Sequence, residues 1–162
     1  MNSRLGPFVA VVIAAAALVT TGSSAQAETK TPGFSTPTLS THAGGVSIQT
    51  TTVVSHGIWS CTLGANLPNR WYGGSGGGEQ AFGYLNCSHV MPEIHIEVSL
   101  YRNGSPVAST DNDKLSASIA NAAPSKSPHT SGTYKSGALA SVRWPDNTIS
   151  QIPQIFSGTI SL

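Results

Sequence analysis

The segment from Glu93 to Tyr101 constrains the fold of this 162-residue chain most strongly, because apolar and other side chains alternate along it without interruption. Every second residue is aliphatic: Ile94, Ile96, Val98 and Leu100. The positions between them hold Glu93, His95, Glu97, Ser99 and Tyr101. A period of two places these two sets on opposite faces of a β-strand. One buried face and one solvated face are typical of a strand in an antiparallel sheet.

A β-hairpin is predicted directly after this strand. Asn103-Gly104 follows it, and both residue types accept a positive φ, which favours a two-residue type I′ turn. The returning strand is predicted over Pro106 to Thr110. Pro106 can begin that strand only where the hydrogen-bond ladder needs no donor.

Further short strands and turn signals continue along the chain. Strands are predicted from their β-branched content and alternation at Val46–Val54, Ile58–Leu63, Gln80–Cys87, Leu115–Ala120 and Tyr134–Trp144, with closing strands around Ile152, Ile155-Phe156 and Ile160–Leu162. Loops or turns are predicted at Gly64–Glu79, Asp111–Lys114, Asn121–Gly132 and Pro145-Asp146-Asn147. The sequence therefore predicts an all-β domain, an antiparallel β-sandwich of immunoglobulin-like shape, with a small closed β-barrel as the alternative.

The first 27 residues have the layout of a secretory signal peptide. Arg4 supplies a positive charge, Phe8 to Val19 is an unbroken apolar run, and Ala25-Gln26-Ala27 forms a small-x-small cleavage site. The apolar run is shorter than the roughly 20 residues that a membrane-spanning helix needs. We therefore expect a secreted, extracellular protein with no membrane span after signal removal.

Residues 28–44 are rich in Thr, Pro, Ser and Gly and hold few large apolar groups, so we predict a flexible leader there. Residues 45–162 are predicted to form a single domain, which their number suits. Cys61 and Cys87 are the two cysteines of the chain, and export predicts that they form a disulfide. The disulfide would close a loop of about 25 residues, and in the chain-entropy model such a bridge stabilises the fold by roughly 3–3.5 kcal/mol.

The balance of charge excludes several classes of partner. Lys and Arg number 8 and Asp and Glu number 7, and Arg4 is lost with the signal peptide, which leaves a net charge near zero. The basic residues are scattered singly. A nucleic-acid binder needs a basic patch that neutralises phosphates, and an anionic membrane surface attracts basic clusters in the same way. We expect neither partner.

One candidate binding site lies between the two cysteines. Arg70, Trp71 and Tyr72 precede the glycine-rich segment Gly73–Gly78. The glycines lack the Lys-Ser/Thr that a phosphate-binding loop requires. Exposed aromatic and arginine side chains, in contrast, are common contacts for sugars and for protein partners. The alternative is that Trp71 folds back onto the disulfide as part of the core.

A second candidate is the polar face of the central strand, with His95, Glu97 and Tyr101. A metal on this face would need ligands from other strands, and Glu93 and Glu97 would lie roughly 13 Å apart, too far for a pair of glycosidase carboxylates. The alternative is an ordinary solvated face. Asp111-Asn112-Asp113 resembles the start of a calcium loop but lacks the glycine and glutamate that should follow. No metal site and no cofactor is assigned.

Catalytic signals are weak throughout. The sequence has no Gly-x-Ser-x-Gly elbow, and oxidation would remove both thiols as nucleophiles. No catalytic residue is assigned. We expect a non-catalytic binding protein that acts on an extracellular protein or a cell-envelope glycan. Two alternatives stay open: a secreted antagonist, such as a protease inhibitor or an antibacterial protein, and a small extracellular hydrolase.

Overall fold

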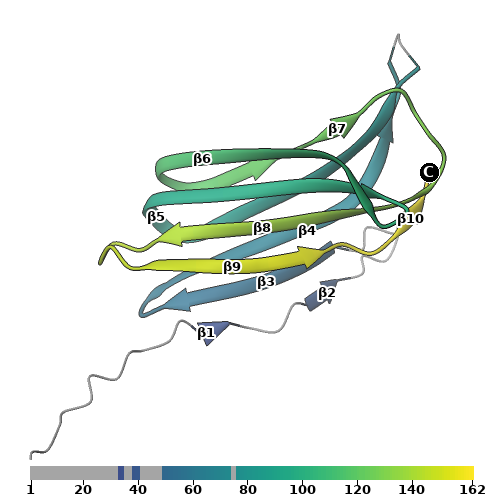
Figure 1. The fold of residues 1–162 in the computed structure, drawn as a ribbon. Coiled ribbons are helices and arrows are strands. Elements are labelled where there is room, and N and C mark those ends of the chain that lie inside the picture. The colour runs from purple at the N-terminus through teal and green to yellow at the C-terminus, as the bar shows by residue number, and fades with distance from the viewer. Residues whose placement is uncertain (1–32, 35–37, 41–48, 74–75) are drawn as a thin grey trace, which may run out of the picture. The chain divides into compact units, whose positions relative to one another are not determined.

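The structure, a computed structural model, describes residues 33–34, 38–40, 49–73 and 76–162, and every element within these ranges is a strand (Figure 1). The ten strands are β1 (Gly33–Phe34), β2 (Thr38–Ser40), β3 (Gln49–His56), β4 (Trp59–Trp71), β5 (Gly78–Arg102), β6 (Ser105–Ala122), β7 (Ser125–Lys126), β8 (Thr133–Arg143), β9 (Ile149–Phe156) and β10 (Ile160–Ser161). The predicted signal peptide, residues 1–27, lies outside the described residues. Of the predicted leader, residues 28–44, the structure describes only β1 and β2, which both pair with β3. The described part of the chain contains no helix with the length and hydropathy to cross a membrane.

All ten strands belong to one antiparallel sheet. The order along its main path is β1-β3-β4-β5-β8-β10, with β2 on β3, β6 and β7 on β5, and β9 on β8. The sheet curls on itself, as Figure 1 shows. The all-β, antiparallel prediction is therefore confirmed. The pairing does not establish two separate sheets of immunoglobulin type.

The curl follows from the length of β5 and from a break in its pairing. The first half of β5 pairs with β4, from Trp71↔Gly78 to Cys61↔Cys87, and the second half pairs with β8, from Glu93↔Arg143 to Arg102↔Tyr134. β6 accompanies both halves along the opposite edge, with a register shift between Asn86 and Met91. An irregularity of this kind bends a strand and increases its twist. β5 thus carries two branches of the sheet.

The two halves of β5 pack face to face. A Cβ atom on Gly83, in the first half, would lie 2.6 Å from Val98 Cγ2 in the second half and 3.2 Å from Ala138 Cβ on β8. Only glycine fits between them without displacing the neighbours. β6 turns in the same place: Ser116 has a φ of 49°, and Asn112 Nδ2 donates a 2.7 Å hydrogen bond to the carbonyl of Asn121. In a straight strand these two residues would be roughly 30 Å apart.

The core lies inside the curl, and the predicted inward faces are confirmed. The aliphatic residues of the central strand are all buried, as are Ala138, Ala140 and Val142 of β8 and Trp144, which follows it, all four on one face of the strand predicted at Tyr134–Trp144. Trp144 is among the largest of the fully buried side chains, and its indole N–H donates a 2.8 Å hydrogen bond to Ser150 Oγ. Each large apolar side chain buried in this way contributes about 1.5–3 kcal/mol.

Two of the predicted turns are confirmed. Asn103 and Gly104 both have positive φ, 50° and 88°, and the strands pair Arg102 with Ser105 on either side, as the type I′ turn requires. The segment Pro145–Asn147 also turns, with Asn147 at a φ of 66°.

Two other predicted loops are wrong. Most of Gly64–Glu79 is strand, because β4 continues to Trp71 and pairs with β5 along its length. Pro68 suggested a loop, but it lies in the register shift between Asn66 and Asn69, where the ladder needs no donor from it. Asp111–Lys114 was expected to turn and instead lies within β6, where pairing with β5 satisfies the backbone.

The predicted disulfide is present. Cys61 and Cys87 are direct partners on β4 and β5, with 3.9 Å between their Cα atoms. The bridge therefore joins neighbouring strands of one sheet. It closes one end of the paired segment whose other end, at Trp71 and Gly78, forms the base of the glycine-rich tip.

Candidate functional site

The tip of the β4–β5 hairpin, defined here as Arg70, Trp71 and Tyr72, contains the first predicted site. Tyr72 follows the last residue of β4 and is 80% exposed, whereas the other two side chains are half-buried. The guanidinium carbon of Arg70 lies 4.9 Å from the centroid of the Tyr72 ring. A cation–π contact of this kind favours one orientation of the exposed ring.

Trp71 lies against the glycine-rich segment. A Cβ atom on Gly73 would lie 2.7 Å from Cζ3 of the indole, so the ring covers that glycine closely. The disulfide is at the opposite end of the paired segment. The structure thus places Trp71 at the tip of the hairpin and not on the sulfur bridge.

Buried polar atoms without partners lie at the hairpin tip and on the part of β5 that pairs with it. Within the described residues Arg70 Nε, Trp71 Nε1 and Glu79 Oε2 are buried and have no hydrogen-bond partner. Glu79 is fully buried, and its other carboxylate oxygen contacts Nδ1 of His129. Burial raises the pKa of Tyr134 and the negative charge of Glu79 raises it further. Folded proteins leave few buried polar groups unpaired. This end of the molecule therefore holds more unpaired buried side-chain atoms than the rest of the described chain.

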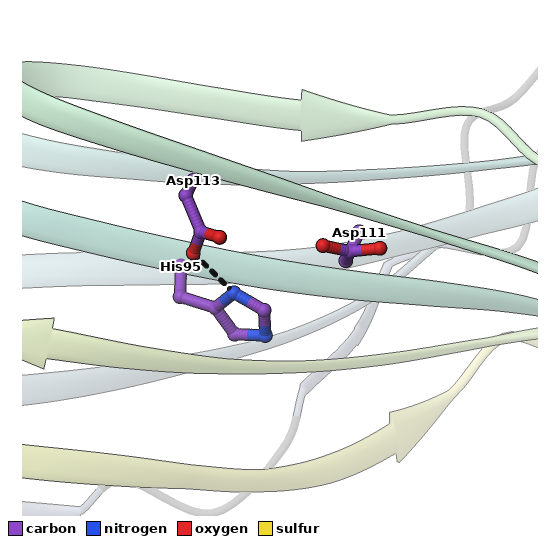
Figure 2. Close-up of side chains that lie close together, drawn as sticks. All are labelled: His95, Asp111 and Asp113. Atoms are coloured by element: carbon purple, nitrogen blue, oxygen red, sulfur yellow. Dashed lines mark hydrogen bonds and ion pairs between the residues drawn. The ribbon is translucent and has the colours of Figure 1, made fainter.

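The second predicted site lies on the outer face of β5, where β6 adds residues that the sequence did not assign to it. His95 is the direct register partner of Asp113, and its Nδ1 lies 2.6 Å from Asp113 Oδ1 (Figure 2). Asp111, two residues earlier on β6, is on the same face. One donor atom from each of these three residues lies within 4.8 Å of the others. They form the His95–Asp111–Asp113 cluster, which has the donor types to hold a divalent cation.

Glu97 borders this cluster. It is the register partner of Asp111, and Ser109 Oγ donates a 3.0 Å hydrogen bond to its Oε1. Glu93, on the same face, forms an ion pair with Arg143 at 2.9 Å. On this face the side chains of His95 and Glu97 are half-buried, whereas those of Asp111 and Asp113 are exposed.

Tyr101 belongs to a different group on the same strand. Its ring meets Phe156 edge-on at 5.4 Å between centroids, and Gln154 Nε2 donates a 3.0 Å hydrogen bond to its hydroxyl. Lys135 Nζ lies 4.0 Å from the Phe156 ring centroid, and both rings cover Gly137 on β8. The three residues predicted on this face are therefore divided: His95 and Glu97 lie beside the β6 carboxylates, and Tyr101 joins an aromatic group.

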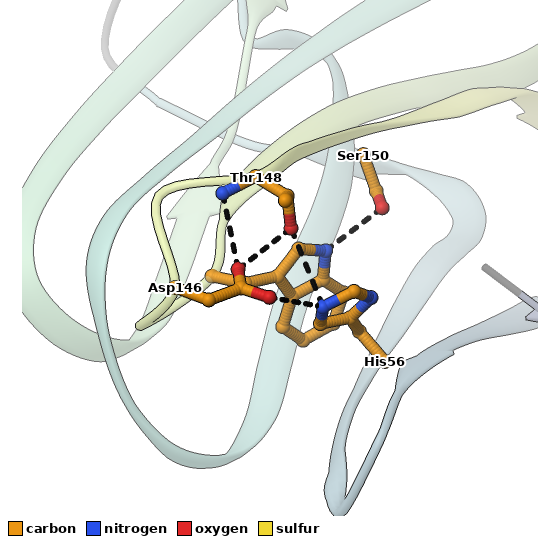
Figure 3. Close-up of polar contacts among 5 residues, drawn as sticks. His56, Asp146, Thr148 and Ser150 are labelled. Atoms are coloured by element: carbon orange, nitrogen blue, oxygen red, sulfur yellow. Dashed lines mark hydrogen bonds and ion pairs between the residues drawn. The ribbon is translucent and has the colours of Figure 1, made fainter. Parts of the chain in front are cut away.

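A third polar group, which the sequence did not predict, joins the β3–β4 and β8–β9 turns (Figure 3). His56 Nε2 lies 2.6 Å from Asp146 Oδ2, and the His56 ring stacks on Trp144 at 5.5 Å between centroids. Thr148 donates from its backbone N–H and its hydroxyl to Asp146 Oδ1, at 3.0 and 2.7 Å. The hydrogen bonds from His56 and Thr148 lower the pKa of Asp146 from 3.8 to about 2.

A further histidine on β5, His89, lies outside these groups. His89 Nδ1 is 3.0 Å from Ser88 Oγ, and the pair is exposed. Within the described residues His89 forms no ion pair with a carboxylate. Among the described residues the pair therefore lacks the orienting acid of a catalytic triad.

Comparison with known proteins found no matching family model, no similar curated sequence and no similar solved structure.

Proposed function

We propose that this chain is a secreted, non-catalytic binding protein, and that the hairpin tip contacts its ligand, an extracellular protein or a cell-envelope glycan. The observation that carries the proposal is the 80% exposure of Tyr72 beneath the Arg70 guanidinium. Tyr, Trp and Arg dominate the energetics of protein interfaces, and aromatic rings also stack on sugars. Tyrosine orders at low entropic cost because it has few rotatable bonds.

The scaffold supports this role. The tip is held at the end of a long paired segment, which a disulfide closes at its other end. A rigid base reduces the entropy lost when the tip binds. An immunoglobulin-like arrangement of the curled sheet is part of the same proposal, since such folds carry binding loops at the ends of the sheets. The disulfide supports an oxidising location outside the cytoplasm.

The test is capture of ligand from culture supernatant and from isolated cell envelope by the immobilised mature protein. We expect Tyr72→Ala to weaken capture by about tenfold or more, the usual effect at an interface hot spot. Trp71→Ala should weaken it as well. Protease treatment of the envelope before capture separates the two ligand classes, because a glycan survives that treatment and a protein does not.

The matched control is Ile58→Ala, which truncates another large side chain, 81% exposed, on the β3–β4 turn. It should capture as the unmodified protein does. Equal capture by Tyr72→Ala and the unmodified protein would reject the hairpin tip as the contact. Equal losses in Tyr72→Ala and Ile58→Ala would indicate adhesion to any exposed apolar group.

A further inference from the structure

We propose that His95, Asp111 and Asp113 form a binding site for one divalent transition-metal ion, with Zn²⁺ the best match. The geometry of two neighbouring strands places the three side chains together. β5 holds His95 opposite Asp113, and the period of two along β6 brings Asp111 to the same face. Their donor atoms already lie within 4.8 Å of one another.

The donor set selects the class of metal. Imidazole nitrogen suits Zn²⁺ and related ions, whereas Ca²⁺ and Mg²⁺ take oxygen ligands only. Three protein ligands with an open fourth position are typical of zinc sites that bind water or a ligand. With metal–ligand distances of about 2.0–2.2 Å, tetrahedral ligands are roughly 3.4 Å apart. Asp113 must therefore move away from His95 slightly and Asp111 must approach.

The side chains have the freedom for that adjustment, and their backbone does not need to move. Asp113 is 64% exposed and His95 31% exposed. β5 is paired on both edges at this point, with β6 and with β8. Ligands placed on paired strands are held more precisely than ligands on loops.

Charge provides an independent argument for a cation here. Glu97 and Asp111 face each other across β5 and β6, and neither forms an ion pair in the part of the chain that the structure describes. Glu93, on the same face, is neutralised by Arg143. Three carboxylates, those of Glu97, Asp111 and Asp113, thus lie on the same face as His95, and none of them forms an ion pair with a Lys or Arg among the described residues. A bound cation would supply the positive charge that neighbouring side chains do not provide to these carboxylates.

The test is titration of the metal-free mature protein with ZnCl₂, followed by calorimetry and by equilibrium dialysis. We expect one Zn²⁺ per chain. His95→Ala and the double variant Asp111→Asn/Asp113→Asn should each lower the affinity for Zn²⁺ by about tenfold or more. Loss of a residue that only hydrogen-bonds to a metal ligand already has an effect of that size, so loss of a ligand should have at least the same effect. Titration with Co²⁺ adds a spectroscopic readout, because tetrahedral Co²⁺ absorbs visible light strongly and hydrated Co²⁺ does not. Circular dichroism of each variant checks that the strands are retained.

The matched control is His89→Ala, an exposed histidine on the same strand outside the cluster. It should bind Zn²⁺ as the unmodified protein does. Absence of binding would overturn the proposal, as would equal affinity in His95→Ala or a lower stoichiometry in His89→Ala. Binding of Ca²⁺ that depends on the two aspartates and not on His95 would overturn the assignment to a transition metal.

Discussion

Two pairs of histidine and aspartate have the same contact distance in this protein and opposite surroundings. His56 with Asp146 and His95 with Asp113 each lie 2.6 Å apart. His56 is only 17% exposed, lies 6.1 Å from the Trp59 ring and 5.5 Å from the Trp144 ring between centroids, and joins turns 90 residues apart. His95 joins adjacent strands and is more open.

The difference lies in what occupies the remaining positions around each carboxylate. Both oxygens of Asp146 are used, one by His56 and one by Thr148. No comparable donor contacts Asp113 among the described residues, and a second aspartate lies beside it. The first pair is a closed structural contact. The second leaves acceptors free, and free acceptors are what a metal ion requires.

The largest expected effect comes from removing the support beneath the closed pair. Trp144→Ala deletes a fully buried indole on which His56 stacks. We expect the free energy of unfolding to fall by about 3–5 kcal/mol, as for other buried aromatic residues. Urea titration monitored by circular dichroism measures it. Ser150→Ala, which removes only the indole's hydrogen-bond partner, should cost less. A loss no larger than that of Ser150→Ala would contradict the role given to the ring.

The second effect distinguishes the two histidines. His56→Ala removes a ring that stacks on two tryptophans and contacts a carboxylate, so we expect a loss of about 1–2 kcal/mol in the free energy of unfolding. Urea titration again provides the measurement. A neutral result would mean that the β3–β4 and β8–β9 turns hold together without this contact.

The third effect is a dependence on pH. The pKa of Asp146 is lowered from 3.8 to about 2 in the folded protein, so the unfolded state binds the proton first as the pH falls. The stability that this carboxylate contributes is fully present above about pH 4 and is lost between pH 4 and pH 2.

Asp146→Asn should therefore be less stable than the unmodified protein at neutral pH, and the two should converge as the pH approaches 2. Thermal unfolding at a series of pH values tests this expectation. A difference in stability that stays constant from neutral pH to pH 2 would show that the asparagine acts through geometry and not through the lost charge.

The smallest effect is expected at the open pair. His95→Ala in metal-free protein should change the free energy of unfolding by no more than about 0.5 kcal/mol, as for other surface substitutions. Measured beside His56→Ala in the same urea titration, it completes the comparison. A loss as large as that of His56→Ala would mean that both pairs are structural.

Local pattern predicted the strands well where one face is buried. The alternation from Ile94 to Leu100 and the turn at Asn103-Gly104 were both confirmed, because each depends on residues close together in the chain. The prediction of a turn at Asp111–Lys114 was wrong because it also relied only on residues close together in the chain. Asp and Asn favour turns locally, but a continuous ladder with β5 satisfies the same backbone groups.

Contacts between residues far apart in the sequence could not be predicted from the local pattern. Nothing in the sequence around His56 indicates Asp146, and no local signal distinguishes two stacked sheets from one sheet that bends within β5. The cluster at His95 was only half visible, since its histidine is on a strand that was predicted and its two aspartates are in the segment of β6 that was predicted to turn. Only the pairing register of β5 with β6 places Asp111 and Asp113 beside His95.

The bend within β5 has a consequence for how the protein comes apart. Because one strand runs through both branches and Gly83 lies against Val98, neither branch can detach while the other stays whole. Unfolding should then be a single cooperative event. Slowly exchanging backbone amides of β4 and of β8, although on different branches, should report the same opening free energy in hydrogen–deuterium exchange.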